Sequence, residues 1–404
     1  MTRHIALLAA LTAVLALAGC GSSHPATTAA STPTSTATTP ATATTATTPT
    51  TPTQTSTGAS AGQPAGGPVP PGFDPVSFTA ISDKEFWLLG TAPCSNPVCT
   101  SIVRTTDGGA HFVGIPAPVA PLAIGTRAGV SELRFANPRD GFAGPGGFQT
   151  APLWATHDGG EHWHAALSHV IAFTVSGNRV YALTGSCTNG TCSGLALSVS
   201  PAPADQWTST RLPVKSLSGA PALTAHDSSV WLSLTAAGSA PGSEVLVYSN
   251  DGGHTLQTRS SPCTPGLGGD LEASSAQVVW AVCPTGMMAQ AWRSADAGAH
   301  WESLPVRPGL SNGARIAPAS DSAAVISAGG VAPVYRTTDE GRTFVTVVPP
   351  SGSGPGWDWI GFTDPMTGSA LRAGAGTGVN GEAPFELWRS SDGGTHWSGP
   401  VPIH

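Results

Sequence analysis

Charged side chains are scarce in this chain of 404 residues, and lysine is nearly absent. The 17 basic and 24 acidic residues make up 10% of the sequence, against about 25% in an ordinary soluble domain. With a net charge of −7 and only Lys84 and Lys215 as lysines, the chain lacks the basic surface that nucleic-acid binding requires. Low charge together with 50 glycines and 37 prolines also excludes a long coiled coil.

Long apolar runs are equally rare, and the one present lies at the N-terminus. Residues 5–18 follow Arg3 as an apolar run of 14, which is too short for a stable transmembrane helix and typical of a signal peptide. The run ends in Leu17-Ala18-Gly19-Cys20, which resembles a bacterial lipobox. The resemblance implies a lipoprotein signal peptide over residues 1–19 and a lipidated Cys20 that anchors the chain to the membrane. An ordinary signal peptide cleaved nearby is the alternative.

No Asp, Glu, Lys or Arg lies between Arg3 and Asp74. Residues 22–57 are Ser, Thr, Pro or Ala at every position except His24 and Gln54. Such a segment has no apolar face to bury and cannot offset the entropy of ordering. We therefore expect residues 20–71 to be a disordered tether and residues 72–404 to form the folded domain.

The seven cysteines divide into Cys20 and six others. An even number in an exported protein indicates disulfides. Four of the six form two pairs with the same spacing of five, so each of these pairs is expected to close its own loop, and the last two cysteines then pair with each other. The expected disulfides are Cys94–Cys99, Cys187–Cys192 and Cys263–Cys283. A zinc site is the alternative, but the spacing lacks the usual C-x2-C knuckle.

One short motif recurs along the chain. Each copy has Ser or Thr, Asp two positions later, Gly two positions after that, and a closing Phe, Trp or Leu. The copies are Thr105–Phe112, Thr156–Trp163, Ser249–Leu256, Ser294–Trp301, Thr337–Phe344 and Ser390–Trp397. Neighbouring aspartates lie 51, 93, 45, 43 and 53 residues apart, so the doubled interval indicates a missing copy. The segment Leu197–Trp207, which keeps a Trp and an Asp, is expected to be its degenerate form, and seven units of about 48 residues result.

These copies resemble the Asp-box of the bacterial neuraminidase repeat (BNR), S/T-x-D-x-G-x-T-W, with His in place of Thr in four of them. In such a turn the aspartate accepts the backbone N–H groups that follow it, and the glycine takes a positive φ. The hydroxyl is expected to tie the opposite strand, and the aromatic residue to pack into the layer beneath. The expected structural residues are Asp107, Asp158, Asp251, Asp296, Asp339, Asp392, Gly109, Gly160, Gly253, Gly298, Gly341 and Gly394. Calcium binding or acid catalysis by these aspartates is disfavoured, because no calcium-binding loop or paired carboxylates accompany them.

Each unit also has two short strands before its motif. Clear examples are 132–135 and 140–143, 222–225 and 230–234, and 271–274 and 278–282. Adding the strands that flank the motif gives four strands per unit, and no window after residue 20 predicts an amphipathic helix. The sequence therefore predicts an all-β fold, a seven-bladed β-propeller of four-stranded antiparallel blades over residues 72–404. The ring is expected to close either by packing of the first blade against the last or by addition of a segment near Pro70–Asp74 to the last sheet.

Nine aromatic residues occupy just two positions of the repeat, which predicts a core between blades rather than a platform for ligands. They are Trp87, Trp154, Tyr181, Trp231, Tyr248, Trp280, Trp292, Tyr335 and Trp388.

A sialidase needs a tyrosine nucleophile, a glutamate, an acid aspartate and three arginines around the substrate. All three tyrosines here occupy the aromatic positions just described, and the Arg-Ile-Pro motif of that family has only a near match at Arg315–Pro318. Other Asp-box hydrolases use two aspartates between two propellers, and only one propeller fits this length. The remaining acids mostly lie in expected tight turns; they are Asp140, Asp227, Asp270, Asp321, Asp358 and Asp364. We therefore expect no catalytic residues.

Four histidines lie close together in the sequence: His157, His162, His164 and His169. Alternation along a strand would bring His162 and His164 to one face, as a metal site would require. His162, however, occupies the same motif position as His111, His300 and His396, which favours a packing role. No metal and no cofactor are expected.

The pattern is similar to single-domain, seven-bladed Asp-box proteins, including the photosystem II stability and assembly factor family, whose propeller binds protein partners. The motifs are expected on one face and the longer loops on the other, where a ligand would bind; these loops are Cys94–Cys99, Gly144–Pro152, Cys187–Cys192, Ala237–Ser243 and Gly374–Pro384. Together with the expected lipobox, this resemblance implies an exported, monomeric module that is lipid-anchored to the outer face of the bacterial cytoplasmic membrane. We expect it to bind a protein or glycan of the cell envelope without catalysing a reaction. A carbohydrate-active hydrolase, sialidase-like or of another glycoside hydrolase type, is the alternative.

Overall fold

The computed structural model describes residues 63–404, apart from 96–97, 124–126, 148, 238–242, 265–266, 308, 329–332, 348–356 and 374–384. The expected signal peptide, Cys20 and most of the expected tether lie outside the described residues. The chain divides into two units, residues 1–56 and 57–404, and everything below concerns the second. Within the described residues, no helix is long and apolar enough to span a membrane.

Short antiparallel strands make up the regular structure of the described residues. They are β1 (Asp74–Ala80), β2 (Phe86–Pro93), β3 (Val98–Thr105), β4 (Val113–Ile115), β5 (Glu132–Phe135), β6 (Gly141–Gly144), β7 (Ala151–Thr156), β8 (His164–Ser176), β9 (Arg179–Thr188), β10 (Thr191–Pro201), β11 (Thr208–Arg211), β12 (Ser216–Ser218), β13 (Ala222–His226), β14 (Ser229–Ala236), β15 (Ser243–Ser249), β16 (Gln257–Ser260), β17 (Asp270–Ala273), β18 (Val279–Pro284), β19 (Met288–Ser294), β20 (Glu302–Ser303), β21 (Leu310–Ser311), β22 (Arg315–Pro318), β23 (Ala324–Ser327), β24 (Val334–Thr337), β25 (Val345–Val347), β26 (Trp357–Phe362), β27 (Gly368–Ala373), β28 (Phe385–Ser390) and β29 (Ser398–Val401). The predicted all-β fold is confirmed.

Consecutive strands pair into four-stranded antiparallel sheets. The runs β1–β4, β22–β25 and β26–β29 are separate sheets, and β17–β20 form another, to which β21 adds beside β19. The strands from β5 to β16 form one assembly of 12 strands. Within it, β5–β8, β8–β11 and β13–β16 repeat the same pairing order. The long β8 joins two of these runs, because its first part pairs with β7 and its last part with β9.

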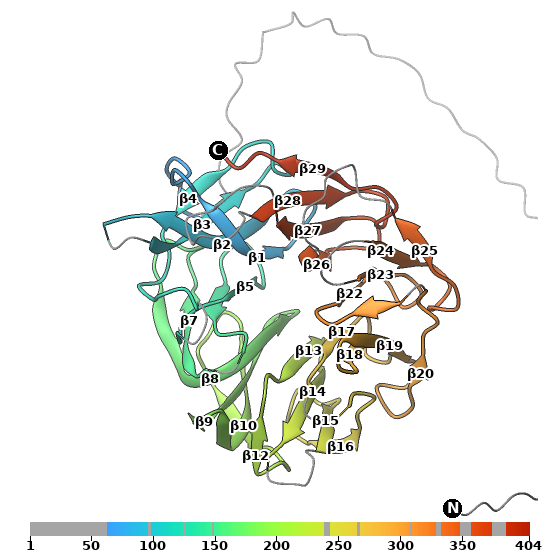
Figure 1. Cartoon of the computed structure of the whole chain (residues 1–404). Coiled ribbons are helices and arrows are strands. Elements are labelled where there is room, and N and C mark those ends of the chain that lie inside the picture. Colours follow the sequence, from blue (N-terminus) through green and yellow to red (C-terminus); the bar gives the residue numbers. More distant parts are fainter. Residues whose placement is uncertain are drawn as a thin grey trace, which may run out of the picture. The chain divides into compact units, whose positions relative to one another are not determined.

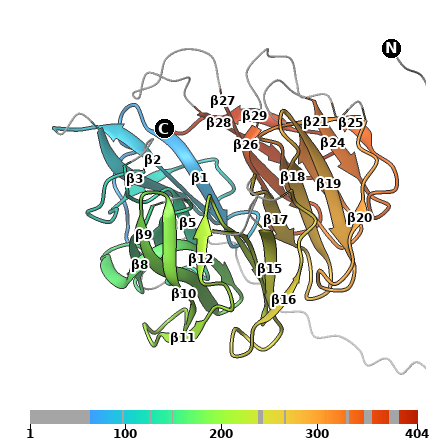
Figure 2. The same ribbon diagram turned by 60° about the horizontal axis from the view of Figure 1, so that its bottom comes forward.

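The sheets of this unit stand around a central axis, with the first strand of each run nearest the axis (Figure 1). In chain order the inner strands are β1, β5, the last part of β8, β13, β17, β22 and β26. Each inner strand lies against the next, and the sheet of β26 returns to β1. In Figure 2, turned from the first view, the strands β17–β20 again stand beside one another.

Apolar side chains fill the spaces between neighbouring sheets. Trp87 of β2 stacks on Phe135 of β5 with ring centroids 3.9 Å apart, and Trp231 of β14 shares a core with Leu271 of β17. Complete burial of one such side chain stabilises the fold by about 1.5–3 kcal/mol. All nine aromatic residues of the repeat lie in or against these cores, which confirms their predicted role.

The first and last sheets meet without exchanging a strand. Among the described residues, β1 pairs with β2 and the last sheet contains β26–β29 alone. Phe78 and Phe86 of the first sheet share a core with Leu371 and Leu387 of the last. Of the two expected modes of closure, packing of the first sheet against the last is the one observed.

Residues 63–71 depart from the expected tether and lie along the first sheet. Gly67 and Gly114 exchange two backbone hydrogen bonds of 2.8 and 2.9 Å, and the buried guanidinium of Arg104 donates to the Pro64 carbonyl at 2.8 Å. This segment covers the outer edge at β4, where backbone groups would otherwise be unpaired. The folded unit therefore begins before residue 72.

Candidate functional site

The six recurring motifs form turns between the third and fourth strands of their sheets, and we call them the aspartate turns (Thr105–Phe112, Thr156–Trp163, Ser249–Leu256, Ser294–Trp301, Thr337–Phe344 and Ser390–Trp397). In the first, Asp107 Oδ1 accepts from Thr105 Oγ1 at 2.8 Å and from the His111 backbone N–H at 3.0 Å. Thr105 Oγ1 accepts the Gly109 N–H at 3.0 Å. The hydroxyl therefore closes its own turn, and the expected bond to the opposite strand is wrong. The same three bonds recur in the other five turns.

The residue four positions after each aspartate supplies one more bond. His111 Nδ1 donates to Asp107 Oδ2 at 2.7 Å, as Thr255 Oγ1 does to Asp251 Oδ2 at 2.7 Å. The four turn histidines (His111, His162, His300 and His396) have side chains 84–91% exposed. Their expected packing role is wrong, because each replaces threonine as a local donor to the carboxylate.

These bonds keep the turn aspartates ionised. The backbone N–H and hydroxyl of Thr255 lower the pKa of Asp251 to about 2. At Asp107, burial works in the opposite direction, but the bonds from His111 and Thr105 outweigh it and lower the pKa to about 2. A carboxylate whose oxygens are already occupied by its own turn fits a structural role.

Each aspartate turn is also bonded to the turn between the first and second strands of its sheet. The Gly108 N–H donates to the Lys84 carbonyl at 2.9 Å, and the Gly252 N–H donates to the Ser228 carbonyl at 2.8 Å. Both kinds of turn therefore lie on one face, which we call the aspartate-turn face.

The expected degenerate copy forms a turn between β10 and β11. Ser200 Oγ accepts the Gln206 N–H at 2.9 Å, and the Ala202 N–H donates to the Asn178 carbonyl at 2.9 Å. Ala202 stands two positions after the serine, where the other copies have aspartate. Asp205 is therefore not the aspartate of the motif, and its carboxylate is free of the bonds that occupy the others.

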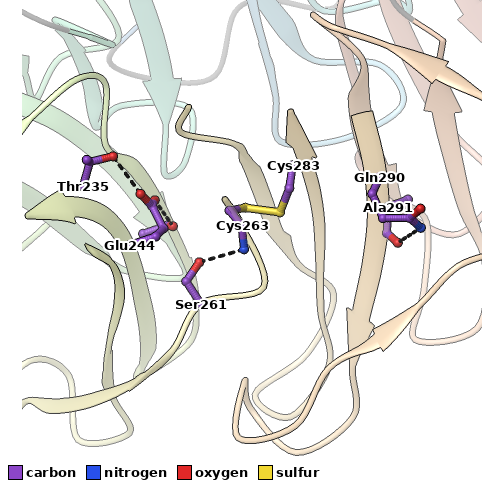
Figure 3. The surroundings of a disulfide bond; sticks show 8 residues. Thr235, Glu244, Ser261, Cys263, Cys283, Gln290 and Ala291 are labelled. Carbon is purple, nitrogen blue, oxygen red and sulfur yellow. Dashed lines mark hydrogen bonds between the residues drawn. A yellow bond between two sulfur atoms is a disulfide. The ribbon is translucent and has the colours of Figure 1, made fainter. Parts of the chain in front are cut away.

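The three expected disulfides are present: Cys94–Cys99, Cys187–Cys192 and Cys263–Cys283. The first two cross the turns β2–β3 and β9–β10, and the third joins the segment after β16 to the end of β18 (Figure 3). These positions lie opposite the aspartate turns, so we call this side the disulfide face. The alternative zinc site of the cysteines is wrong. Much of the expected ligand loops, Ala237–Ser243 and Gly374–Pro384, lies outside the described residues, so a ligand surface on the disulfide face stays a prediction.

A cavity of about 250 Å³ lies between the inner strands, and we call it the central hollow. Every inner strand contributes to its wall, through Thr79, Arg134, Thr174, Thr224, Glu272, Ala317 and Ile360 among others. A second hollow of about 630 Å³ is lined by turns of the aspartate-turn face and shares Ala273, Pro318 and Phe362 with the first. The central hollow therefore continues toward the aspartate-turn face.

Charged groups line one part of the central hollow. Arg134 Nη2 pairs with Glu132 Oε2 at 2.8 Å on β5. On β17, burial and the negative charge of Asp270 raise the pKa of Glu272 to about 8, although Arg134 opposes this. Burial also raises the pKa of Asp270, whose Oδ2 accepts the Ile316 N–H at 2.9 Å. At neutral pH the hollow thus offers a carboxylic acid that can donate a hydrogen bond, in the same wall as the guanidinium of Arg134.

The sequence analysis did not single out Glu132, Arg134 or Glu272. Their signal was present as alternation, since Glu132 and Arg134 are two residues apart on one strand, as are Asp270 and Glu272 on another. Alternation alone did not show that these two strands face the same cavity.

Antiparallel four-stranded sheets around an axis define a β-propeller. Solved structures with this fold include YCF48 bound to a D1 peptide (16% identity, 80% of this chain and 94% of that chain, TM-score 0.50). They also include the β-propeller domain of the Trilobed protease from Pyrococcus furiosus, described as having an open velcro topology (8% identity, 83% and 98% coverage, TM-score 0.53). A puromycin-hydrolyzing peptidase from Mycobacterium tuberculosis is similar too (13% identity, 83% and 56% coverage, TM-score 0.53). No family model matches the chain, and no curated protein matches it. At these identities the likeness shows the fold alone.

Proposed function

We propose that this chain is an exported, lipid-anchored β-propeller of seven blades that binds a protein or glycan of the cell envelope. The blade count is supported by the inner strands β1, β5, β8, β13, β17, β22 and β26, and by six aspartate turns with one degenerate copy. The lipid anchor and envelope location are supported by residues 1–20 and by the three disulfides, since disulfides persist outside the reducing cytoplasm.

The observation that carries the binding role is the polar wall of the central hollow. A guanidinium and a protonated carboxyl group in a partly desolvated site can recognise carboxylates, amides or hydroxyls by directed hydrogen bonds. A hollow of about 250 Å³ admits a side chain or one sugar ring rather than a folded domain. The D1 peptide bound to YCF48 supports a peptide as one class of ligand.

Capture experiments with the full-length chain test this proposal. Proximity labelling in the producing bacterium would mark the envelope proteins and cell-wall glycans that lie next to the chain, and the labelled molecules would then be captured. We expect Arg134→Gln to lose the labelled partner at least tenfold, while Arg342→Gln, which changes an exposed arginine of an aspartate turn, retains it. Equal labelling by the two variants would show that the central hollow is not part of the binding site.

A glycoside hydrolase is the second candidate function, because Glu272 is a carboxyl group that keeps its proton near neutral pH, as a general acid must. A panel of fluorogenic glycosides, sialosides included, separates the two functions. Turnover that Glu272→Gln abolishes and Glu302→Gln preserves would establish the hydrolase. Absence of turnover across the panel favours the binding module.

A further inference from the structure

Two histidines and one aspartate converge where the second aspartate turn meets the degenerate turn. His157 lies in the turn Thr156–Trp163, His164 is the first residue of β8, and Asp205 lies in the turn between β10 and β11. One ligand atom from each of the three lies within 4.8 Å of the other two. His164 Nε2 is 2.5 Å from Asp205 Oδ2, and His157 Nε2 is 3.4 Å from the same oxygen.

The orientation of His157 is set by a carboxylate on the far side of its ring. His157 Nδ1 lies 2.9 Å from Oδ1 of Asp140, whose side chain is only 10% exposed. A carboxylate only accepts, so the Nδ1–H donates to Asp140, and the lone pair of a neutral imidazole is left on Nε2. Metal-binding histidines carry this same outer partner, which fixes both tautomer and ring position.

The ligand atoms of this cluster face one another. Nε2 of His157 and Nε2 of His164 both lie beside the same oxygen of Asp205, so a single cation placed between them would contact all three groups. Asp205 can act as a ligand because it does not occupy the aspartate position of the degenerate turn. In the other turns the carboxylate at that position accepts hydrogen bonds from its own turn.

We propose that His157, His164 and Asp205 bind a divalent first-row transition metal ion, with Zn²⁺ as the occupant. Two imidazole nitrogens and one carboxylate oxygen are a common Zn²⁺ ligand set with a further position for water. Ca²⁺ and Mg²⁺ are disfavoured, since both prefer oxygen ligands alone. At metal–ligand distances of about 2.0–2.2 Å, tetrahedral ligand atoms lie about 3.4 Å apart, so the three groups need only small side-chain rotations.

The metal would fasten two neighbouring blades on the aspartate-turn face. His157 precedes β8, the fourth strand of one blade, and His164 is the first residue of that strand. Asp205 belongs to the degenerate turn between β10 and β11 of the next blade. Side-chain exposures of 29%, 51% and 27% for His157, His164 and Asp205 leave the ion open to solvent on one side. This role is independent of the central hollow and of the function proposed for it.

Equilibrium dialysis of the full-length chain against Zn²⁺ tests the site, with Cys20 retained and an affinity tag free of histidine. After chelator treatment, we expect the wild type to bind one more equivalent of Zn²⁺ than Asp205→Asn or His164→Gln. His162→Gln is the matched control, because His162 lies two residues before His164 but bonds only to its own turn aspartate. It should bind as the wild type does, and excess Ca²⁺ should not displace the ion.

Two further readouts separate ligation from a structural effect. Co²⁺ should give visible ligand-field bands with the wild type that Asp205→Asn lacks, and Zn²⁺ should raise the thermal midpoint of the wild type but not that of Asp205→Asn. Asp140→Asn should keep the stoichiometry and weaken affinity about 10–100-fold. Equal Zn²⁺ binding by wild type and Asp205→Asn, with both folded by circular dichroism, would overturn the proposal and leave a hydrogen-bonded surface cluster.

Discussion

The backbone N–H of Phe385 donates a hydrogen bond to Asp74 Oδ1 at 2.9 Å, although the two residues are 311 positions apart. Asp74 begins the first strand and is buried, and Phe385 begins the third strand of the last sheet. Because no strand is exchanged among the described residues, the two ends of the ring are joined by side-chain contacts. These are this bond, the shared apolar core and the bond from Arg389 Nη2 to the Asp83 carbonyl at 2.9 Å.

Replacing Asp74 with alanine should therefore destabilise the whole ring. Loss of a buried charge-assisted bond, with an N–H left unpaired, costs about 1–3 kcal/mol. Urea unfolding of Asp74→Ala should show this decrease in the free energy of unfolding, and Glu161→Ala, at an exposed position of an aspartate turn, should match the wild type. Equal stability of the two variants would mean that the apolar core and the bond from Arg389 to the Asp83 carbonyl close the ring without help from Asp74.

Acid should weaken the fold through the aspartate turns. The pKa of Asp251 falls from 3.8 to about 2 on folding, so its ionised form stabilises the folded state above pH 3.8, and this contribution is lost as the pH falls toward 2. Asp251→Asn should be less stable than the wild type at pH 7, with the difference vanishing near pH 2. Unfolding measured across pH checks this, with Asp227→Asn, at a side chain 78% exposed, as the surface control that should match the wild type at pH 7.

Glu272 should produce the opposite pH dependence. Its pKa rises from 4.5 to about 8 on folding, so the protonated side chain is tolerated at low pH and the folded state loses stability as the pH rises from 4.5 to 8. Glu272→Gln should gain stability relative to the wild type over this range, as measured by thermal unfolding. If the gain is the same at pH 4.5 and pH 8, ionisation of Glu272 in the central hollow is not its cause.

The motif glycines should differ in their tolerance of alanine. Gly394 has φ of 83°, and an added Cβ would lie 2.5 Å from Val325 Cγ2, which is buried. Gly109 has a similar φ of 94°, but its nearest contacts would be at 3.3 Å. Both variants carry the strain of a positive φ, so the overlap at Gly394 should cost about 1–3 kcal/mol more. Chemical denaturation of Gly394→Ala and Gly109→Ala measures this difference directly.

Much of the fold could be predicted from local patterns. The strand expected at 132–135 is β5 to the residue, and those expected at 222–225 and 271–274 match β13 and β17 to within one residue. Short alternating strands between glycine-rich turns leave little freedom of register, because a slip of one residue would turn every apolar side chain outward. The disulfides could be predicted as well. Two of them join cysteines on the two sides of one short turn, and the third pairs the two cysteines that remain.

The sites could not be predicted in the same way, because each joins distant units. Arg134 and Glu272 face one cavity from strands 138 positions apart. His157, His164 and Asp205 come together only because Asp205 is displaced from the motif position in the degenerate turn. The recurrence of histidine at the position of His162 predicted a side chain packed in the core. The same recurrence is produced by an exposed histidine that donates a hydrogen bond to the aspartate of its own turn. Period and spacing describe one unit at a time and carry no information about which units meet.

If the chain is anchored at its N-terminal end, as we propose, the segment 63–71 has a mechanical consequence. A pull on the chain N-terminal to residue 63 reaches the ring through Gln63, whose Nε2 donates to the Pro138 carbonyl at 2.8 Å, and through the paired backbones of Gly67 and Gly114. These contacts take the load at the turn between β5 and β6 and at the outer edge of the first sheet, and not at the joint between Asp74 and Phe385. Under tension the segment 63–71 would detach from the sheets first. Its release would lengthen the tether while the ring stays closed.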